Sequence, residues 1–175
     1  MYKQIIEVIR KNLKYILIFL LFADICYSLV QHYHVNLDGD MASVILPMDG
    51  YKQMLGDPLG ISALKGEYYL GTNRYFAHLA MLTYFNTAPY ICQLVVNPID
   101  SLYLSCAIAK LGIQLFIIFL LSVYISGTWN ILKKEFLISA VLITPLFQSF
   151  GFNSSIGIID KSITYAFFTR YRLAC

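Results

Sequence analysis

Two long apolar runs limit what this chain can fold into more than any other feature. Residues 13–30 and 98–125 contain few charges, and each can cross a bilayer as a helix, which takes about 17–25 residues. The whole chain is 58% hydrophobic and 13% charged, whereas soluble domains carry about 25% charged residues. Too few charges remain to cover a surface that faces water. We therefore predict an all-α, polytopic integral membrane protein with the lipid bilayer as a partner.

The other segments complete a prediction of about three spans and a partial fourth. A positive lead before an apolar run is also typical of a signal peptide, but no small-residue cleavage site follows, so we interpret the run as a retained span. A third apolar run carries Pro145 near its far end, where proline ends or kinks a helix. The predicted division is a cytoplasmic basic lead at 1–12, transmembrane helices at 13–30, 98–125 and 136–150, an extracytoplasmic loop at 31–97, a cytoplasmic loop at 126–135, and an outer loop with an incomplete fourth helix at 151–175.

Basic residues predict the orientation of these spans. The first 14 residues hold four Lys or Arg, the 126–135 loop holds two, and two spans separate these segments. Short segments rich in Lys and Arg stay in the cytoplasm, whereas long loops cross the membrane largely regardless of charge. The N-terminus is therefore predicted to be cytoplasmic and the 31–97 loop extracytoplasmic.

The 31–97 loop contains apolar stretches that are too short to span. One covers residues 41–46 and ends at Pro47, and another covers residues 74–85. A helix of that second length rises about 18 Å, short of the about 30 Å hydrocarbon core. Such pieces suit interfacial helices that lie on the membrane surface with Tyr and Phe at headgroup level. A small folded extracytoplasmic domain with its own core is the alternative.

Two carboxylates, Asp38 and Asp40, closely follow the first span and flank Gly39. Such a pair can converge on one divalent cation, Mg²⁺ or Mn²⁺, or one carboxylate can act as a base while the other binds the metal. Asp-Gly is also a common turn dipeptide, so a plain turn is the alternative. The position beside a span and before a long aromatic loop favours a site that meets a lipid-linked phosphate.

Asp24 and Lys110 are ionisable residues inside the predicted spans. Charged groups in hydrocarbon are costly and usually have a partner or face a cavity. Asp24 is expected about 10 Å below the outer end of its span, and Lys110 can snorkel back to a similar depth. We therefore predict an intramembrane pair that packs the two helices together, with Gln114 nearby, or that serves a proton or ion path.

Other chemistries have less support in the sequence. The three histidines, His32, His34 and His78, lack further Cys or His ligands at zinc spacing, so their expected role is hydrogen bonding at the interface. The four cysteines share no metal-ligand spacing and are interpreted as packing residues. No basic stripe of the kind that nucleic acid needs is present, which sets nucleic acid aside as a partner.

An N-terminal span, the acidic motif NLDGDMA just past its outer end, and a long first outer loop together resemble the start of a GT-C membrane glycosyltransferase. The phrases PIDSLYLSCAIAK and ITPLFQSFG are similar to uncharacterised multi-spanning bacterial proteins. The resemblance implies a helical fold in the bacterial inner membrane and transfer of a sugar from a polyprenyl-phosphate donor to an acceptor at the outer face. It implies Asp38 or Asp40 as catalytic base or metal ligand. Charge alone suggests Arg74 or Lys52 as the residue that binds the donor phosphate.

These enzymes have more spans than this chain shows. We therefore expect the N-terminal part of a longer glycosyltransferase, inactive by itself. A second hypothesis is a non-catalytic integral membrane subunit or scaffold whose outer loop binds a partner, and a third is a piece of a small transporter or channel. Substitution of Asp38 and Asp40 separates the first two hypotheses, and substitution of Asp24 and Lys110 tests the third.

Overall fold

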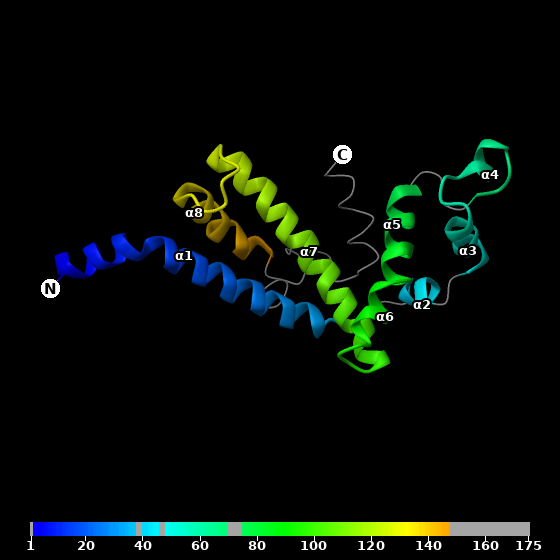
Figure 1. Cartoon of the computed structure of the whole chain (residues 1–175), viewed down its shortest axis with the longest axis horizontal. Helices are drawn as coiled ribbons and strands as arrows, with labels where there is room; N and C mark the ends of the chain where they lie inside the picture. Colours follow the sequence, from blue (N-terminus) through cyan, green and yellow to red (C-terminus); the bar gives the residue numbers. More distant parts are fainter. Residues whose placement is uncertain (1, 38–39, 46–47, 70–74, 148–175) are drawn as a thin grey trace. The chain divides into compact units, whose positions relative to one another are not determined.

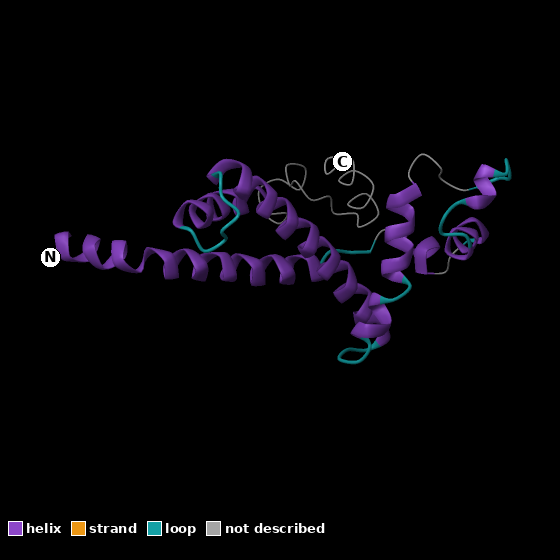
Figure 2. Cartoon of the chain, turned by 45° about the horizontal axis from the view of Figure 1, so that its top comes forward, coloured by secondary structure: helices purple, strands orange, loops and turns teal. Residues whose placement is uncertain are grey.

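A computed structural model describes residues 2–37, 40–45, 48–69 and 75–147 of the chain. All regular structure in these residues is helical, which confirms the all-α prediction (Figure 1, Figure 2). The described residues form two compact units. The span unit comprises the residues up to His32 and from Ile108 onward, and the loop unit comprises the residues from Tyr33 to Ala107.

Among the described residues, two helices are long and apolar enough to cross a membrane, and they coincide with the first two of the about three spans that the sequence predicts. They are the Lys11–Tyr33 part of α1 (Tyr2–Tyr33), with a mean hydropathy of 2.0, and α7 (Pro98–Ser126), with a mean hydropathy of 2.2. The predicted lead and first span form one continuous helix, because no Gly or Pro interrupts it. α7 starts at Pro98, whose fixed φ suits a first turn, and ends before Gly127, which adopts a left-handed φ of 63°.

α8 (Lys134–Ile143) and the short 3-10 helix η2 (Thr144–Phe147) complete the span unit. The α-helix ends two residues before Pro145, as predicted. Together the two helices rise about 23 Å, which is short of a full span, and residues 148–150 lie outside the described residues. The third span therefore stays a prediction. The buried side chains that hold α8 and η2 against α7 are Ile118, Phe136, Ala140, Ile143 and Phe147, with Leu21 of α1 packed on them.

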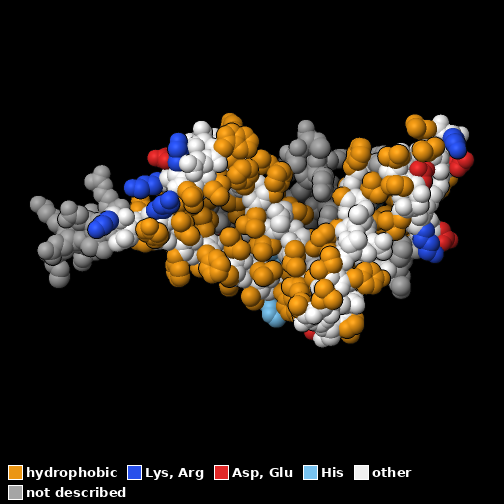
Figure 3. All heavy atoms as spheres, in the orientation of Figure 1, with side chains coloured by type: hydrophobic (Ala, Val, Ile, Leu, Met, Phe, Trp, Pro, Cys, Tyr) orange, Lys and Arg blue, Asp and Glu red, His pale blue; other side chains and the backbone are white. Residues whose placement is uncertain are grey.

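Basic side chains gather at one end of the span unit. α1 and α7 run antiparallel, because His32 contacts Gln114 while the earlier Leu21 packs on the cluster that contains the later Ile118. The N-terminal end of α1 and the start of α8 therefore lie at the same end. Figure 3 shows Lys and Arg side chains there and hydrophobic side chains along the helices. This distribution agrees with the predicted cytoplasmic side, which stays a prediction.

The loop unit has a small core built around α5 (Tyr75–Phe85). α2 (Asp40–Ile45) and α3 (Asp49–Gly56) pack on α5, as does α6 (Ala88–Cys92). Described residues of the stretches 41–46 and 74–85 supply much of this core, and their expected place on the membrane surface stays a prediction, as does the alternative of a separate folded domain. Short apolar helices can leave water by packing on one another as well as by lying on a bilayer. The buried side chains include Met41, Val44, Met54, Met81, Leu82 and Phe85.

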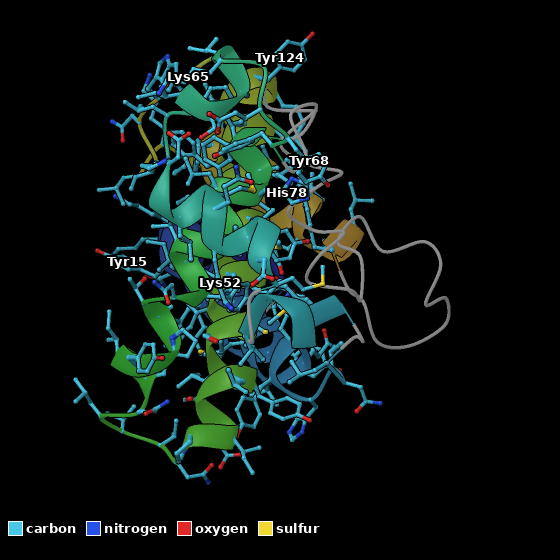
Figure 4. All side chains as sticks on the ribbon, turned by 90° about the vertical axis from the view of Figure 1, so that its right-hand side faces the viewer. Tyr15, Lys52, Lys65, Tyr68, His78 and Tyr124 are labelled. Atoms are coloured by element: carbon cyan, nitrogen blue, oxygen red, sulfur yellow. The ribbon has the colours of Figure 1, made fainter. Side chains whose placement is uncertain are left out.

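Side-chain contacts fasten α5 to its neighbours within the loop unit. The hydroxyl of Tyr84 donates a 2.8 Å hydrogen bond to the carbonyl oxygen of Ser105 in α7. Burial raises the pKa of Tyr84 to about 12, so this hydroxyl keeps its proton at neutral pH. The ring of His78, labelled in Figure 4, lies 6.0 Å from the ring of Tyr51 in α3.

Candidate functional site

The acidic motif lies between the end of the first span and the first helix of the loop unit. α1 ends at Tyr33 and α2 begins at Asp40, so a short connection separates Asp40 from a helix that can cross a membrane. Asp38 and Arg74 lie outside the described residues, and only the backbone of Asp40 is described. The catalytic and metal-binding roles of Asp38 and Asp40, and the phosphate-binding role of Arg74, stay predictions.

Lys52 takes part in a surface ion pair on its own helix. Its ammonium group lies 3.2 Å from Oδ1 of Asp49, and the side chains of Lys52 and Asp49 are 65% and 100% exposed. Exposed pairs of this kind add only a few tenths of a kcal/mol to stability and rearrange easily. The structure thus brings no further site residue to Lys52 among those it describes, and its assignment to a donor phosphate stays a prediction.

Asp57, an acid that we expect to be structural from its place in a turn, caps α4 (Ile61–Leu64). Its carboxylate oxygens accept hydrogen bonds from the backbone N–H groups of Ser62 (2.8 Å) and Ile61 (3.0 Å). These bonds hold the pKa of Asp57 below its ordinary value. The chain reaches this cap through Gly60, whose left-handed φ of 65° suits glycine. The structural interpretation of Asp57 is confirmed.

Replacing Asp57 by Ala is expected to loosen the α4 turn, because two backbone N–H groups lose their acceptors. Amide hydrogen exchange of Ile61 and Ser62 should accelerate severalfold at neutral pH. The lowered pKa gives the sign of the pH effect: the cap contributes stability above the ordinary carboxyl pKa and loses it as pH falls through the folded-state value. As pH falls through that value, the extra protection of Ile61 and Ser62 in the wild type over the variant, compared at the same pH, should therefore disappear. Equal protection in both proteins at pH 7 would contradict the cap.

Buried polar side chains connect the two long helices inside the span unit. Nε2 of His32 lies 3.0 Å from Oε1 of Gln114, and Nε2 of Gln114 donates a 3.0 Å hydrogen bond to Oγ of Ser28. With the Gln114 amide assigned in this orientation, His32 must carry its proton on Nε2. All three side chains are at most 3% exposed. We call Ser28, His32 and Gln114 the polar bridge.

Two further polar side chains lie next to the polar bridge in the sequence and are also buried. Lys110 precedes Gln114 by one helical turn and is 2% exposed. Its charge lies close enough to His32 for the two groups to interact. Gln31 adjoins His32 and is 7% exposed, and its Nε2 makes no hydrogen bond to any described residue. The two long helices thus carry a concentration of buried hydrogen-bonding groups where they contact each other.

The polar bridge sets a register that bears on the predicted Asp24–Lys110 pair. Gln114 is level with Ser28 and His32, and the helices run antiparallel. Along the helix axes, Lys110 lies one turn from Gln114 in the direction in which α1 ends. Asp24 lies one to two turns from the polar bridge in the opposite direction, so the two residues are roughly 15 Å apart along the helices. Gln114 bonds to Ser28 and His32, and the intramembrane Asp24–Lys110 pair stays a prediction.

No protein-family model, curated protein or solved structure matches this chain. The site therefore has to be judged on its own residues. Sequence reasoning singled out Asp24, Lys110 and Gln114 but missed Ser28 and Gln31 as parts of one face. The signal was present, because Asp24, Ser28 and Gln31 follow one another at the spacing of a single helix face.

The histidines have the contacts of packing and hydrogen-bonding groups. His32 bonds to Gln114 in a buried position between the two long helices, whereas hydrogen bonding at the membrane interface was predicted for the histidines. His34 packs edge-on against the ring of Tyr33 at 5.5 Å. Within the described ranges, no three His, Cys, Asp or Glu side chains gather as a metal site would need. The Mg²⁺ or Mn²⁺ site at Asp38 and Asp40 stays a prediction.

Proposed function

We propose that this chain is an integral membrane protein and the N-terminal part of a GT-C-like glycosyltransferase. The whole enzyme moves a sugar from a polyprenyl-phosphate donor to an acceptor at the outer membrane face. Asp38 and Asp40 hold Mg²⁺ or Mn²⁺, and one of them acts as the base that activates the acceptor hydroxyl. The donor tail lies in the bilayer beside α1 and α7, and the N-terminus is cytoplasmic.

The short connection from α1 to α2 is the observation that carries this proposal. A donor of this class holds its phosphate at headgroup level, because its polyprenyl tail lies in hydrocarbon. α1 can end at that level, and even a fully extended connection keeps Asp40 within about 25 Å of Tyr33. The folded loop unit, whose first helix after α1 begins at Asp40, then supplies a scaffold for the acidic motif.

A titration of the purified protein with Mn²⁺ and a polyprenyl-phosphate sugar tests the proposed site. The wild type should bind both saturably, with each ligand tightening the other, because the metal bridges the carboxylates and the donor phosphate. Asp38→Asn/Asp40→Asn should lose this coupling because it removes both negative charges. The matched control is Asp49→Asn, which removes an exposed carboxylate of the same unit. Identical binding by all three proteins would contradict the site.

A non-catalytic subunit is the second candidate function. It is favoured by four apolar side chains exposed at and after α6, where the loop unit leads into α7: Tyr90, Ile91, Leu94 and Val95. Such a patch suits contact with a membrane-embedded partner. In this case the Asp38→Asn/Asp40→Asn variant should support the partner complex as well as the wild type does, whereas Leu94→Asp should weaken it.

A further inference from the structure

The turn around α4 exposes large apolar side chains at one end of the loop unit. Their exposed fractions are 79% for Leu59, 48% for Ile61, 86% for Leu64 and 77% for Tyr68. We call these four residues the apolar tip. Figure 4 labels Lys65 and Tyr68, which follow α4 in the sequence and lie apart in that view. No residue of α4 belongs to the core of the loop unit. Soluble proteins seldom leave such a group of side chains in water.

Hydrogen bonds hold the apolar tip in this open shape. Asp57 caps α4, and its carbonyl oxygen accepts a 2.7 Å hydrogen bond from the hydroxyl of Tyr69. Gln53 of α3 donates a 3.0 Å hydrogen bond to the carbonyl oxygen of Tyr68. The turn is thus fastened to α3 at both of its ends. Its apolar side chains are presented outward on a fixed frame, which lowers the entropy cost of binding.

The two long helices account for many of the other exposed apolar side chains but not for the apolar tip. The exposed side chains of α1 and α7 lie on helices that can face lipid, and the α6 patch leads directly into α7. The apolar tip lies far in sequence from both. Yet the loop unit is tied at one end to α1 and at the other to α7, so it is held within reach of any bilayer that these helices cross.

We propose that the apolar tip inserts into the outer leaflet of the bilayer and anchors the loop unit to the membrane. Leu and Ile side chains gain by burial at the boundary of headgroups and acyl chains, and Tyr is enriched at headgroup level. Lys65 and Glu67 in the same turn offset each other in charge, so the partner is the apolar part of the lipid rather than an anionic headgroup. The inference rests on the membrane location in the proposed function and is independent of glycosyl transfer.

A tryptophan placed in the apolar tip tests the inference. Trp129 is the only tryptophan of the chain and packs on Phe119 at 5.9 Å, so Trp129→Phe removes it with a similar ring. Leu64→Trp in this background gives a single reporter at an exposed position. The protein is reconstituted into vesicles of phosphatidylcholine brominated in the upper acyl chain. The emission of the reporter should shift to shorter wavelength and lose on the order of half its intensity to bromine.

Asp49→Trp in the same background is the matched control, because Asp49 is fully exposed on α3 of the same unit. Its emission should stay at long wavelength and unquenched. Adding Leu59→Asp should weaken the quenching of the Leu64→Trp reporter, because a charge opposes insertion. A water-like, unquenched Leu64→Trp reporter would overturn the proposal. A reporter with blue-shifted emission that bromine does not quench would also overturn it, since protein would then cover the tip. Both readings are independent of Asp38 and Asp40, so they leave the glycosyltransferase proposal to its own test.

Discussion

Replacing Asp40 by Asn is expected to slow sugar transfer by about 10²–10⁴-fold, the usual contribution of a positioned general base. Asn keeps the shape of the side chain but can neither accept the proton of the acceptor hydroxyl nor offer a full negative charge to Mn²⁺. The measurement is transfer of sugar from a polyprenyl-phosphate donor in membranes that carry the full-length protein. Asp38→Asn is also expected to slow transfer. The variant that loses less of the transfer rate identifies the residue that binds the metal, and the other residue is the base.

The control for this loss is Asp49→Asn. It removes a carboxylate from the same loop unit and breaks only the exposed pair with Lys52, so transfer should stay near the wild-type rate. Thermal unfolding of the three variants should coincide, because each substitution keeps the size and shape of the side chain. Equal rates for the Asp40→Asn and Asp49→Asn proteins would remove Asp40 from the mechanism. Normal partner assembly without transfer in the wild type would favour the subunit hypothesis.

The long helices could be predicted because their signal is local. An apolar run without Gly or Pro indicates a helix and its approximate length, and α7 matches the predicted second span within one residue at each end. The first span was predicted to begin at residue 13, but α1 begins at Tyr2. A change from charged to apolar residues marks a change of surroundings and does not end a helix, since Lys and Arg are good helix formers.

The surroundings of the short helices could not be predicted in the same way. α5 is apolar on all sides, and this composition suits a helix on a membrane surface as well as one inside a small core. The burial of Met54 in α3 and Met81 in α5 shows that these helices pack on one another, which a helix on a membrane surface can also do. The register of α1 against α7 is likewise non-local, because it depends on which side chains Gln114 meets. A depth count from each helix end cannot supply that information.

Replacing Gln114 by Leu is expected to destabilise the span unit by about 1–3 kcal/mol. Two hydrogen bonds between helices are lost, each worth on average about 0.6 kcal/mol in a membrane protein. His32 and Ser28 are then left buried with fewer partners, which adds a desolvation penalty. Leu fills a similar volume, so a cavity contributes little. The measurement is reversible unfolding in mixed micelles, followed through the loss of helix. The control is Ser122→Ala, because Ser122 is also buried on α7 but its Oγ bonds to no residue that the structure describes.

Gln114→Glu separates the loss of hydrogen bonds from the change of polarity. Glu keeps an acceptor for the Nε2 proton of His32 and places a carboxylate one turn from Lys110, so charge attraction should offset part of the lost bond to Ser28. We therefore expect the order of stability wild type, Gln114→Glu, Gln114→Leu. Combining Ser28→Ala with Gln114→Leu should cost less than the two changes summed, because both remove the same bond. A full sum, or a loss for Ser122→Ala as large as that for Gln114→Leu, would show that the polar bridge does not hold α1 and α7 in register.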